Sequence, residues 1–243
     1  MRLTGPGRGN ASMLWLEPHR VHAGGQFLPF PGAPGIEALG RVLAELPAGP
    51  THWVVDDAWV PSLLLRDIVE LPKGAEAREA FFKWRYGQEL AAEGPQHVQA
   101  LALEGSAWLL AGMPQELREA WIGVASAAGR PMRRMQPRWL WLYNLLAPSR
   151  EVPGMLMSLS RQDDGMYTGT LAAWGRSLTL LRQWPDPAGA EVWVQERVLP
   201  TVAYLQRDGR TPQEAHIWGA PHWPDCGLPL RVIPGEIPAQ EAS

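Results

Sequence analysis

Two pairs of neighbouring aspartates have side chains and a spacing that could support chemistry. Paired carboxylates hold divalent metals or exchange protons with a substrate. Asp56 and Asp57 lie in the stretch 51–59, which we predict to be a strand. Successive strand side chains point to opposite faces, so these two carboxylates are not expected to converge, and we interpret them as a solvated turn. The second pair, Asp163 and Asp164, precedes a glycine, a composition typical of a hairpin turn.

Histidine and cysteine give two further candidates, both for metal binding. His19 and His22 are three residues apart in a predicted strand, where positions i and i+3 face opposite ways. His216, His222 and Cys226 form a second set, but it lacks the paired Cys-x-x-Cys spacing typical of zinc sites. We therefore predict no metal site.

Serine chemistry and nucleotide binding are not supported by any motif. Ser158 and Ser160 lie in an apolar stretch without the Gly-x-Ser-x-Gly turn that exposes a nucleophilic serine. The chain also has no phosphate-binding loop of the Walker type and no dinucleotide fingerprint. We predict no catalytic residues and no cofactor, and expect the chain to act by binding other proteins.

The composition is that of a folded protein with an excess of tryptophan. Of 243 residues, 46% are hydrophobic and 19% are charged, and the net charge of −3 argues against nucleic-acid binding. A single cysteine fits a reducing compartment, and the N-terminal stretch lacks the apolar segment of a signal peptide, so we expect a soluble cytoplasmic protein. Thirteen tryptophans exceed the needs of a core of this size, and some are expected to face partners.

One predicted helix holds the densest group of candidate contact residues. The stretch 63–71 is predicted to be a strand that ends at Pro72, because proline offers no N–H to a sheet. Helix-forming residues follow over 75–90. An amphipathic helix buries a stripe only about 100° wide, so it cannot bury every aromatic ring here, and some are expected to be exposed and to bind a partner. The residues predicted to bind are Phe82, Trp84, Arg85 and Tyr86.

A second helix, predicted over 138–146, raises the same question. Trp139 and Trp141 are two residues apart, so their rings diverge and at least one should face a groove or a partner. A run of arginines precedes and enters this helix. We interpret it as a solvated strand edge leading into the helix, with contact to an acidic partner as the alternative. These residues are Arg130, Arg133, Arg134 and Arg138.

Strands and helices alternate along the chain, which indicates the α/β class. Strands followed by a helix occur twice, from 13 to 46 and from 155 to 206, with additional elements between about 60 and 110. Two similar lobes with an insertion would produce this order. The other predicted strands are 13–17, 20–23, 97–103, 107–111, 131–135, 155–161, 166–174, 177–184, 214–218 and 228–233, and the other predicted helices are 35–46, 115–128 and 190–206.

This order of elements, together with several short motifs, resembles the actin-like proteins PilM of type IV pili and GspL, in its cytoplasmic region, of type II secretion. The similarity extends over about residues 36 to 220. The motifs that carry it are Val69-Glu70-Leu71-Pro72, Phe82-Lys83-Trp84-Arg85, the strand pair His97–Ala111, Ala127-Ala128-Gly129, the helix Trp139–Leu146 and the strands Met155–Trp184.

The resemblance implies a two-lobed actin-like (RNase H-like) fold with a small inserted αβ subdomain and a truncated second lobe. The first lobe would span 1–150, with the insertion at about 60–110, and the second 151–243. It also implies a scaffold at the inner face of the inner membrane. Its partners would be an inner-membrane assembly protein of the PilN or GspM kind and the assembly ATPase, and a homo-oligomer is a further expectation.

Departures from the actin-like pattern concern the phosphate loops. Actin-like ATPases hold phosphates with Asp-x-Gly turns, in which glycine lets the backbone approach the anion. Here the segment 14–18 reads LWLEP, and the segment 155–164 reads MLMSLSRQDD, with no Asp-x-Gly at the end of the predicted strand 155–161; Asp163-Asp164-Gly165 falls in the predicted turn beyond it. Only Gly219 remains where an adenosine loop would follow. We therefore expect a pseudo-ATPase without bound nucleotide. The alternative is an actin-like ATPase or sugar-kinase relative with divergent phosphate loops.

Overall fold

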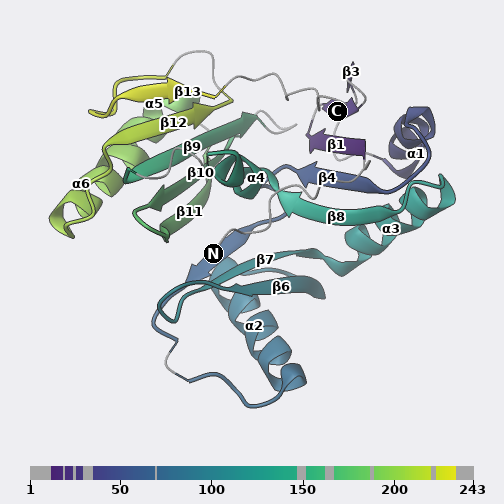
Figure 1. The fold of residues 1–243 in the computed structure, drawn as a ribbon, viewed down its shortest axis with the longest axis horizontal. Coiled ribbons are helices and arrows are strands. Elements are labelled where there is room, and N and C mark those ends of the chain that lie inside the picture. The colour runs from purple at the N-terminus through teal and green to yellow at the C-terminus, as the bar shows by residue number, and fades with distance from the viewer. Residues whose placement is uncertain are drawn as a thin grey trace. The chain divides into compact units, whose positions relative to one another are not determined.

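The computed structural model describes residues 12–18, 20–23, 26–29, 35–68, 70–146, 152–161, 167–186, 189–219 and 223–233 (Figure 1). The chain divides into two compact units, Met1–Arg138 and Trp139–Ser243, which are treated separately below. Both contain helices and strands, which confirms the predicted α/β class. No helix within these ranges is long and apolar enough to cross a membrane.

The first unit is built on a five-stranded sheet in the order β3-β2-β1-β4-β8. β1 pairs antiparallel with β2 and parallel with β4, which in turn pairs parallel with β8. Because β1, β4 and β8 run in the same direction, their carboxyl ends meet at one edge of the sheet (Figure 1). The strands are β1 (Ser12–Glu17), β2 (Arg20–Ala23), β3 (Gln26–Pro29), β4 (Thr51–Val55) and β8 (Met132–Pro137).

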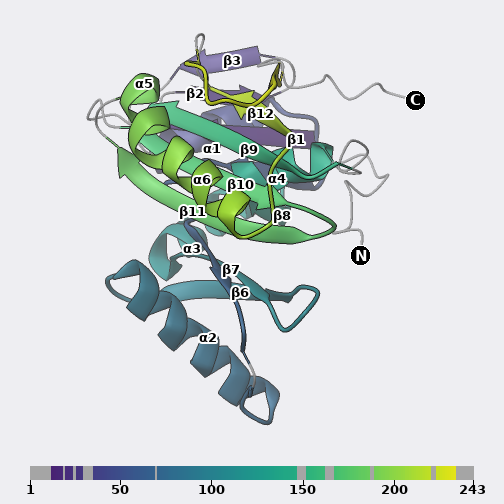
Figure 2. The same ribbon diagram turned by 90° about the vertical axis from the view of Figure 1, so that its left-hand side faces the viewer.

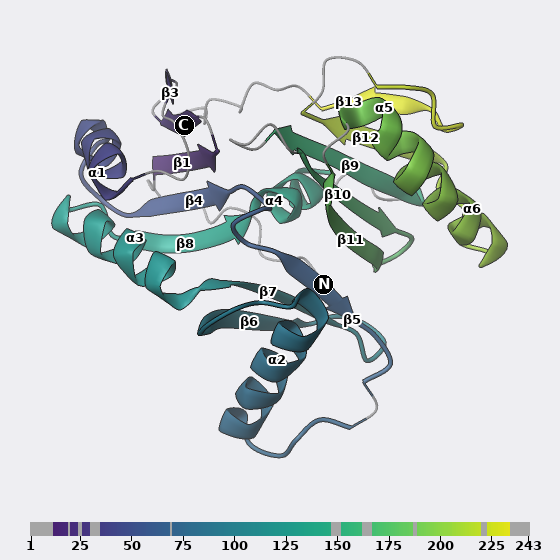
Figure 3. The same ribbon diagram turned by 180° about the vertical axis from the view of Figure 1, so that it is seen from behind.

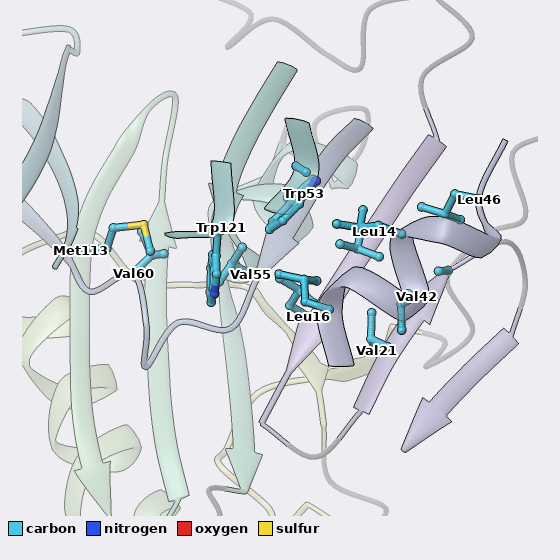
Figure 4. Close-up of a cluster of buried hydrophobic side chains, with 14 residues drawn as sticks. Leu14, Leu16, Val21, Val42, Leu46, Trp53, Val55, Val60, Met113 and Trp121 are labelled. Atoms are coloured by element: carbon cyan, nitrogen blue, oxygen red, sulfur yellow. The ribbon is translucent and has the colours of Figure 1, made fainter. Parts of the chain in front are cut away.

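Two helices, α1 (Ile36–Glu45) and α3 (Gln115–Ala127), pack on one face of this sheet. α1 contributes Leu39, Val42 and Leu43, which recur at helical spacing and are fully or almost fully buried. The centre of the core is aromatic: the rings of Trp53 and Trp121 lie 5.9 Å apart (Figure 4). Apolar side chains from strands and helices thus form one continuous core in this unit.

A small insertion between β4 and α3 has its own sheet and helix (Figure 3). Its strands β5 (Ser62–Leu65), β6 (Gln96–Ala102) and β7 (Trp108–Pro114) are antiparallel and lie in the order β5-β7-β6. Helix α2 (Ala75–Leu90) packs against them through a separate small core. The hydroxyl of one core residue, Tyr86, is 2.9 Å from the Gly112 carbonyl oxygen and 3.0 Å from that of Pro61.

The second unit contains another five-stranded sheet, in the order β11-β10-β9-β12-β13. β9, β10 and β11 form an antiparallel meander, while β9, β12 and β13 are parallel. The strand order therefore repeats that of the first unit. In each sheet, three successive antiparallel strands are followed by two further strands that run parallel to the first of the three. The strands are β9 (Gly154–Arg161), β10 (Tyr167–Trp174), β11 (Leu178–Asp186), β12 (Glu214–Trp218) and β13 (Leu230–Val232).

One irregular helix covers this second sheet (Figure 2). It comprises α5 (Gly189–Trp193), a π-helical turn η2 (Val194–Val198) and α6 (Leu199–Arg207). Pro200 explains the irregularity, because it has no N–H for the bond to the carbonyl four residues earlier and its ring crowds that carbonyl. Trp193 lies flat over Gly169, where a Cβ would come within 2.4 Å of the indole ring.

Most predicted elements are present, with three corrections. The strand expected over 51–59 ends at Val55, and that expected over 63–71 ends at Leu65, soon before Asp67 adopts a left-handed conformation (φ 56°) that no regular strand accommodates. In addition, strand β3 was not predicted. The helix expected over 190–206 is interrupted by η2. The predicted turn at Asp163-Asp164-Gly165 lies outside the described residues.

Candidate functional site

The carboxyl edge of the first sheet holds a cluster of four charged residues. Glu17 is the last residue of β1, Asp56 and Asp57 directly follow β4, and Arg138 directly follows β8 and begins helix α4 (Arg138–Leu145). The cluster lies where the sheet changes from antiparallel to parallel pairing. In open α/β sheets, ligands bind outside the carboxyl ends of the strands, which is where these four residues lie. We call these four residues the Arg138 cluster.

The guanidinium of Arg138 is the centre of this cluster. Its Nη1 donates a 2.8 Å hydrogen bond to Asp56 Oδ2 and lies 3.8 Å from Glu17 Oε1, while Nη2 lies 3.8 Å from Asp57 Oδ2. The Arg138 side chain is 1% exposed and both aspartate side chains are 0% exposed. Glu17 also pairs with Arg20, which is half exposed. One cation thus faces three carboxylates away from solvent.

The interpretation of Asp56-Asp57 as a solvated turn is therefore wrong. Two successive residues of a strand would point to opposite faces. Because β4 ends at Val55, the two aspartates instead occupy a tight turn, in which Asp56 Oδ1 accepts a hydrogen bond from the Ala58 N–H at 2.9 Å. Both side chains can then turn towards Arg138. The burial of Arg138 likewise contradicts its assignment to a solvated strand edge.

The charges of this cluster set the protonation of Arg138. Burial by itself lowers the pKa of the guanidinium, but the carboxylates of Asp56, Asp57 and Glu17 outweigh that effect and raise the pKa above its ordinary value. Arg138 is therefore a permanent cation. Its Nε and Nη2 atoms make no hydrogen bond within the described residues, so the cluster relies on charge attraction more than on complete hydrogen bonding.

The other arginines of the predicted basic run have different environments. Arg130 donates from Nε, at 3.0 Å, and from Nη2 to the carbonyl of Leu46, at the carboxyl end of α1. Arg133 is exposed, as predicted, whereas Arg134 is half-buried. Burial, followed by the charges of Arg134 and Arg133, lowers the pKa of His52. The run is therefore not one uniform solvated edge.

The predicted contact residues on α2 separate into buried and exposed positions. Phe82 and Tyr86 are 5% and 1% exposed and form the insertion's core, because positions i and i+4 share the face that packs on the sheet. Trp84 is 57% exposed. The expectation that this helix cannot bury all its aromatic rings is thus confirmed. Phe82 and Tyr86, however, do not reach the surface, so only Trp84 and Arg85 are placed to meet a partner.

The exposed Trp84 ring on α2 has an aromatic neighbour and a cationic neighbour on the same helix. Its ring centroid is 6.2 Å from that of Phe81, and the Arg85 guanidinium carbon lies 5.9 Å from the indole centroid. Arg85 also forms a 2.9 Å ion pair with Glu89 one turn later. The exposed indole therefore stands beside a cation that is already oriented, an arrangement common at protein interfaces.

The two tryptophans of α4 also differ in burial. Trp139 is 0% exposed and its ring lies 6.2 Å from that of Tyr143, which continues the stack towards Trp174 at 5.8 Å. Trp141 is half-buried. Trp139 is thus a core residue of the second unit, which corrects its assignment to an exposed contact surface, and Trp141 is the better placed of the two.

The metal and nucleophile candidates form no assembled site in the described part of the chain. His216 lies 2.9 Å from Glu214 Oε1 and 5.8 Å from the Trp174 ring, and Cys226 is buried. Ser158 is 0% exposed. No group of three potential metal ligands occurs within the described ranges, and His19 and His222 lie outside them.

Sequence reasoning missed the Arg138 cluster because its members are not local. Asp56 and Arg138 are separated by 82 residues, and no spacing along the chain connects them. One signal was available: Glu17, the Asp56-Asp57 pair and Arg138 each lie at or near the end of a predicted strand. Once those strands are taken as parallel neighbours, their ends must converge at one edge.

Comparison with known proteins gives a likeness in fold. No protein-family model and no curated protein matches the chain. Among solved structures, the cytoplasmic domain of EpsL, an inner-membrane component of the Vibrio cholerae type II secretion system, is similar over 92% of this chain and 89% of its own, with 14% identity and a TM-score of 0.54. A chain of the PilM–PilN type IV pilus biogenesis complex is similar over 93% and 88%, with 13% identity and a TM-score of 0.60. The chain therefore has a PilM/GspL-like fold, as the sequence resemblance predicted.

Proposed function

We propose that this chain is a non-enzymatic assembly protein of a type IV pilus or a type II secretion-like machine. The observation that carries the proposal is the likeness to components of both machines over more than nine-tenths of the chain. A match of this extent involves the insertion as well as both sheets. Fold likeness alone does not define function, so the proposal also depends on the surface and the Arg138 cluster.

We interpret the fold as two actin-like lobes. Both five-stranded sheets have the same strand order, and the β5–α2–β6–β7 insertion interrupts the first. The truncation expected of the second lobe stays a prediction. The lobe boundary between residues 150 and 151 stays a prediction; the compact units meet between Arg138 and Trp139.

The Arg138 cluster favours a scaffold without nucleotide. In actin-like ATPases a carboxylate-bound Mg²⁺ would be expected near this edge of the sheet, next to the phosphates. Here the Arg138 guanidinium occupies the space between three carboxylates and supplies the positive charge itself. The rival function, an ATPase or sugar-kinase relative with divergent phosphate loops, would require this buried pair to open.

The partner contact that we propose is centred on Trp84 and Arg85. An exposed indole beside an oriented guanidinium suits a short extended segment with an apolar and a polar side chain. We propose that the segment belongs to the cytoplasmic part of an inner-membrane protein of the PilN or GspM kind. The chain would then lie at the inner face of that membrane, with the assembly ATPase as a second partner and Trp141 as a secondary contact.

Affinity capture from detergent-solubilised membranes tests this function. The wild-type chain should enrich one inner-membrane protein that has a short cytoplasmic segment, and the double variant Trp84→Ala/Arg85→Ala should lose it. The matched control is Ile36→Ala on α1, which is also exposed, at 55%, but lies on another element. Enrichment of no membrane protein, or equal enrichment by all three chains, would count against the proposal.

A further inference from the structure

Two arginine–aromatic pairs line the boundary between strand β11 and the helix that covers it. The guanidinium carbon of Arg182 on β11 lies 5.7 Å from the Tyr204 ring centroid on α6. That of Arg197 on η2 lies 6.0 Å from the Trp184 ring centroid on β11. In one pair the strand contributes the arginine and the helix the ring; in the other the helix contributes the arginine and the strand the ring. We call these four residues the arginine–aromatic seam.

The seam is held in place by hydrogen bonds between its two elements. Arg182 Nη1 donates to Thr201 Oγ1 at 3.3 Å, and that hydroxyl donates to the Arg197 carbonyl at 2.6 Å. Arg197, Thr201 and Tyr204 follow one another at helical spacing, so they share one helix face. The Arg182 guanidinium is thus oriented before any ligand arrives, which lowers the entropy lost on binding. The Arg197 guanidinium is placed only by its contact with the Trp184 ring.

These two cations have no carboxylate partner in the described part of the chain. Elsewhere, Arg85, Arg138 and Arg231 each form an ion pair with a glutamate or an aspartate. Arg182 and Arg197 are instead exposed and held only by rings and by the hydroxyl of Thr201. Their charge remains available to an anion from outside.

Strand β11 also presents a backbone edge that no other described strand pairs with, although near its start the Thr179 carbonyl accepts a 3.4 Å hydrogen bond from Arg210 Nη1. It is the terminal strand of its sheet, and its nine residues pair only with β10 among the described strands (Figure 2). A terminal strand has outward N–H and C=O groups that can pair with an added strand. An incoming strand places alternate side chains on one face of the sheet. Arg182, on the edge strand, therefore favours an added strand that carries acidic side chains on that face.

We propose that an extended acidic segment of a partner protein adds to the edge of β11, with carboxylates two residues apart facing Arg182 and Arg197. Alternate residues of a strand lie about 6.6 Å apart, and a carboxylate accepts two hydrogen bonds from a guanidinium. Arginine and carboxylate would thus supply specificity, and the backbone ladder would supply affinity. This inference does not depend on the proposed function, because it concerns a different element.

Two other occupants are less compatible with the seam. A second copy of the chain pairing antiparallel through β11 would bring like-charged Arg182 residues towards each other. An anionic membrane would favour a strongly basic protein, whereas the chain has a net charge of −3.

The test uses the full chain and a fluorescein-labelled nonapeptide of alternating Glu and Thr, with a Gln/Thr peptide as the uncharged match. We expect the acidic peptide to bind, with an affinity that falls as salt rises, and the Gln/Thr peptide to bind at least about tenfold more weakly. Arg182→Gln and Arg197→Gln should each weaken binding about tenfold. Arg176→Gln is the control, because Arg176 is exposed in the turn before β11 but outside the seam.

Hydrogen exchange locates the bound peptide. Slower exchange of β11 backbone amides on binding is expected. The inference is overturned if neither peptide binds, if both bind equally, or if protection appears only outside β11. It is also overturned if the arginines prove to mediate sedimentation with anionic vesicles or self-association instead of peptide binding. If a variant unfolds, the comparison of the two peptides on the wild-type chain still tests whether β11 prefers an acidic strand.

Discussion

Arg138 and Asp56 form a buried ion pair with an Nη1–Oδ2 distance of 2.8 Å, although 82 residues separate them in the chain. The pair joins the carboxyl ends of β4 and β8, at the edge where an α/β sheet commonly binds its ligand. Arg138 is also the last residue of the first compact unit. The carboxylates at this edge are therefore already matched by a cation of the chain's own.

Replacing Arg138 by Met should destabilise the first unit strongly. The change removes the cation that faces the buried carboxylates of Asp56 and Asp57, and removal of one partner of a buried pair costs about 3–5 kcal/mol. The measurement is the free energy of unfolding in urea. The control, Arg133→Met, changes an exposed arginine on the same strand and should stay within about 0.5 kcal/mol. Equal stability of the two variants would show that the pair contributes nothing.

Alanine substitutions at Phe82 and Trp84 should have opposite consequences. Phe82→Ala empties part of the insertion's core and should lower the free energy of unfolding by about 3–5 kcal/mol. Trp84→Ala removes a mostly exposed ring and should cost less than about 1 kcal/mol while abolishing capture of the partner. A Trp84→Ala chain that still captures the partner would move the contact elsewhere.

Gly169→Ala should destabilise the second unit. The added methyl would lie 2.4 Å from the Trp193 ring, so the helix or strand must shift, at a cost of about 1–3 kcal/mol. Gly175→Ala is the matched control in the neighbouring turn, where a methyl meets no atom within 4 Å. Thermal unfolding of both variants measures the difference. Similar melting temperatures would contradict the close packing of Trp193 on β10.

The stability of the insertion should fall on mild acidification, in part through His97. Burial, then the charges of Arg118 and Lys83, lowers the pKa of His97. The unfolded chain then takes up a proton near pH 6.5, before the folded chain does. The stabilisation by neutral His97 is therefore complete above that pH and is lost as pH falls through the lowered folded pKa. His97→Gln should flatten the dependence between pH 7 and 5; an unchanged slope would exclude this contribution.

The sequence was sufficient to predict the elements but not the cluster. Helix-forming residues after Pro72 predicted α2 over the observed range Ala75–Leu90, and the predicted strands 155–161, 166–174 and 177–184 correspond to β9, β10 and β11, because each element depends on residues close in the chain. The end of β4 at Val55 was not predicted, since no proline or glycine stops the strand there. That error placed the two aspartates on opposite faces and concealed their shared partner.

Burial within α2 shows a second limit of the sequence. The number of aromatic rings indicated that some had to be exposed, but the choice among them depends on which face meets the sheet. That face is decided by Trp108 and Leu110 of β7, which lie after the helix in the chain. Only the tertiary structure separates Phe82 and Tyr86 from Trp84.

Titration of the chain with Mg-ATP in a calorimeter is the most direct test of the central claim that this is an assembly protein without a nucleotide site. The wild-type chain, with its folding verified by a cooperative thermal transition, should give no binding heat up to millimolar ATP. Micromolar binding would contradict the account, because the nucleotide would have to displace the Arg138 cluster or occupy a site that the present account does not assign.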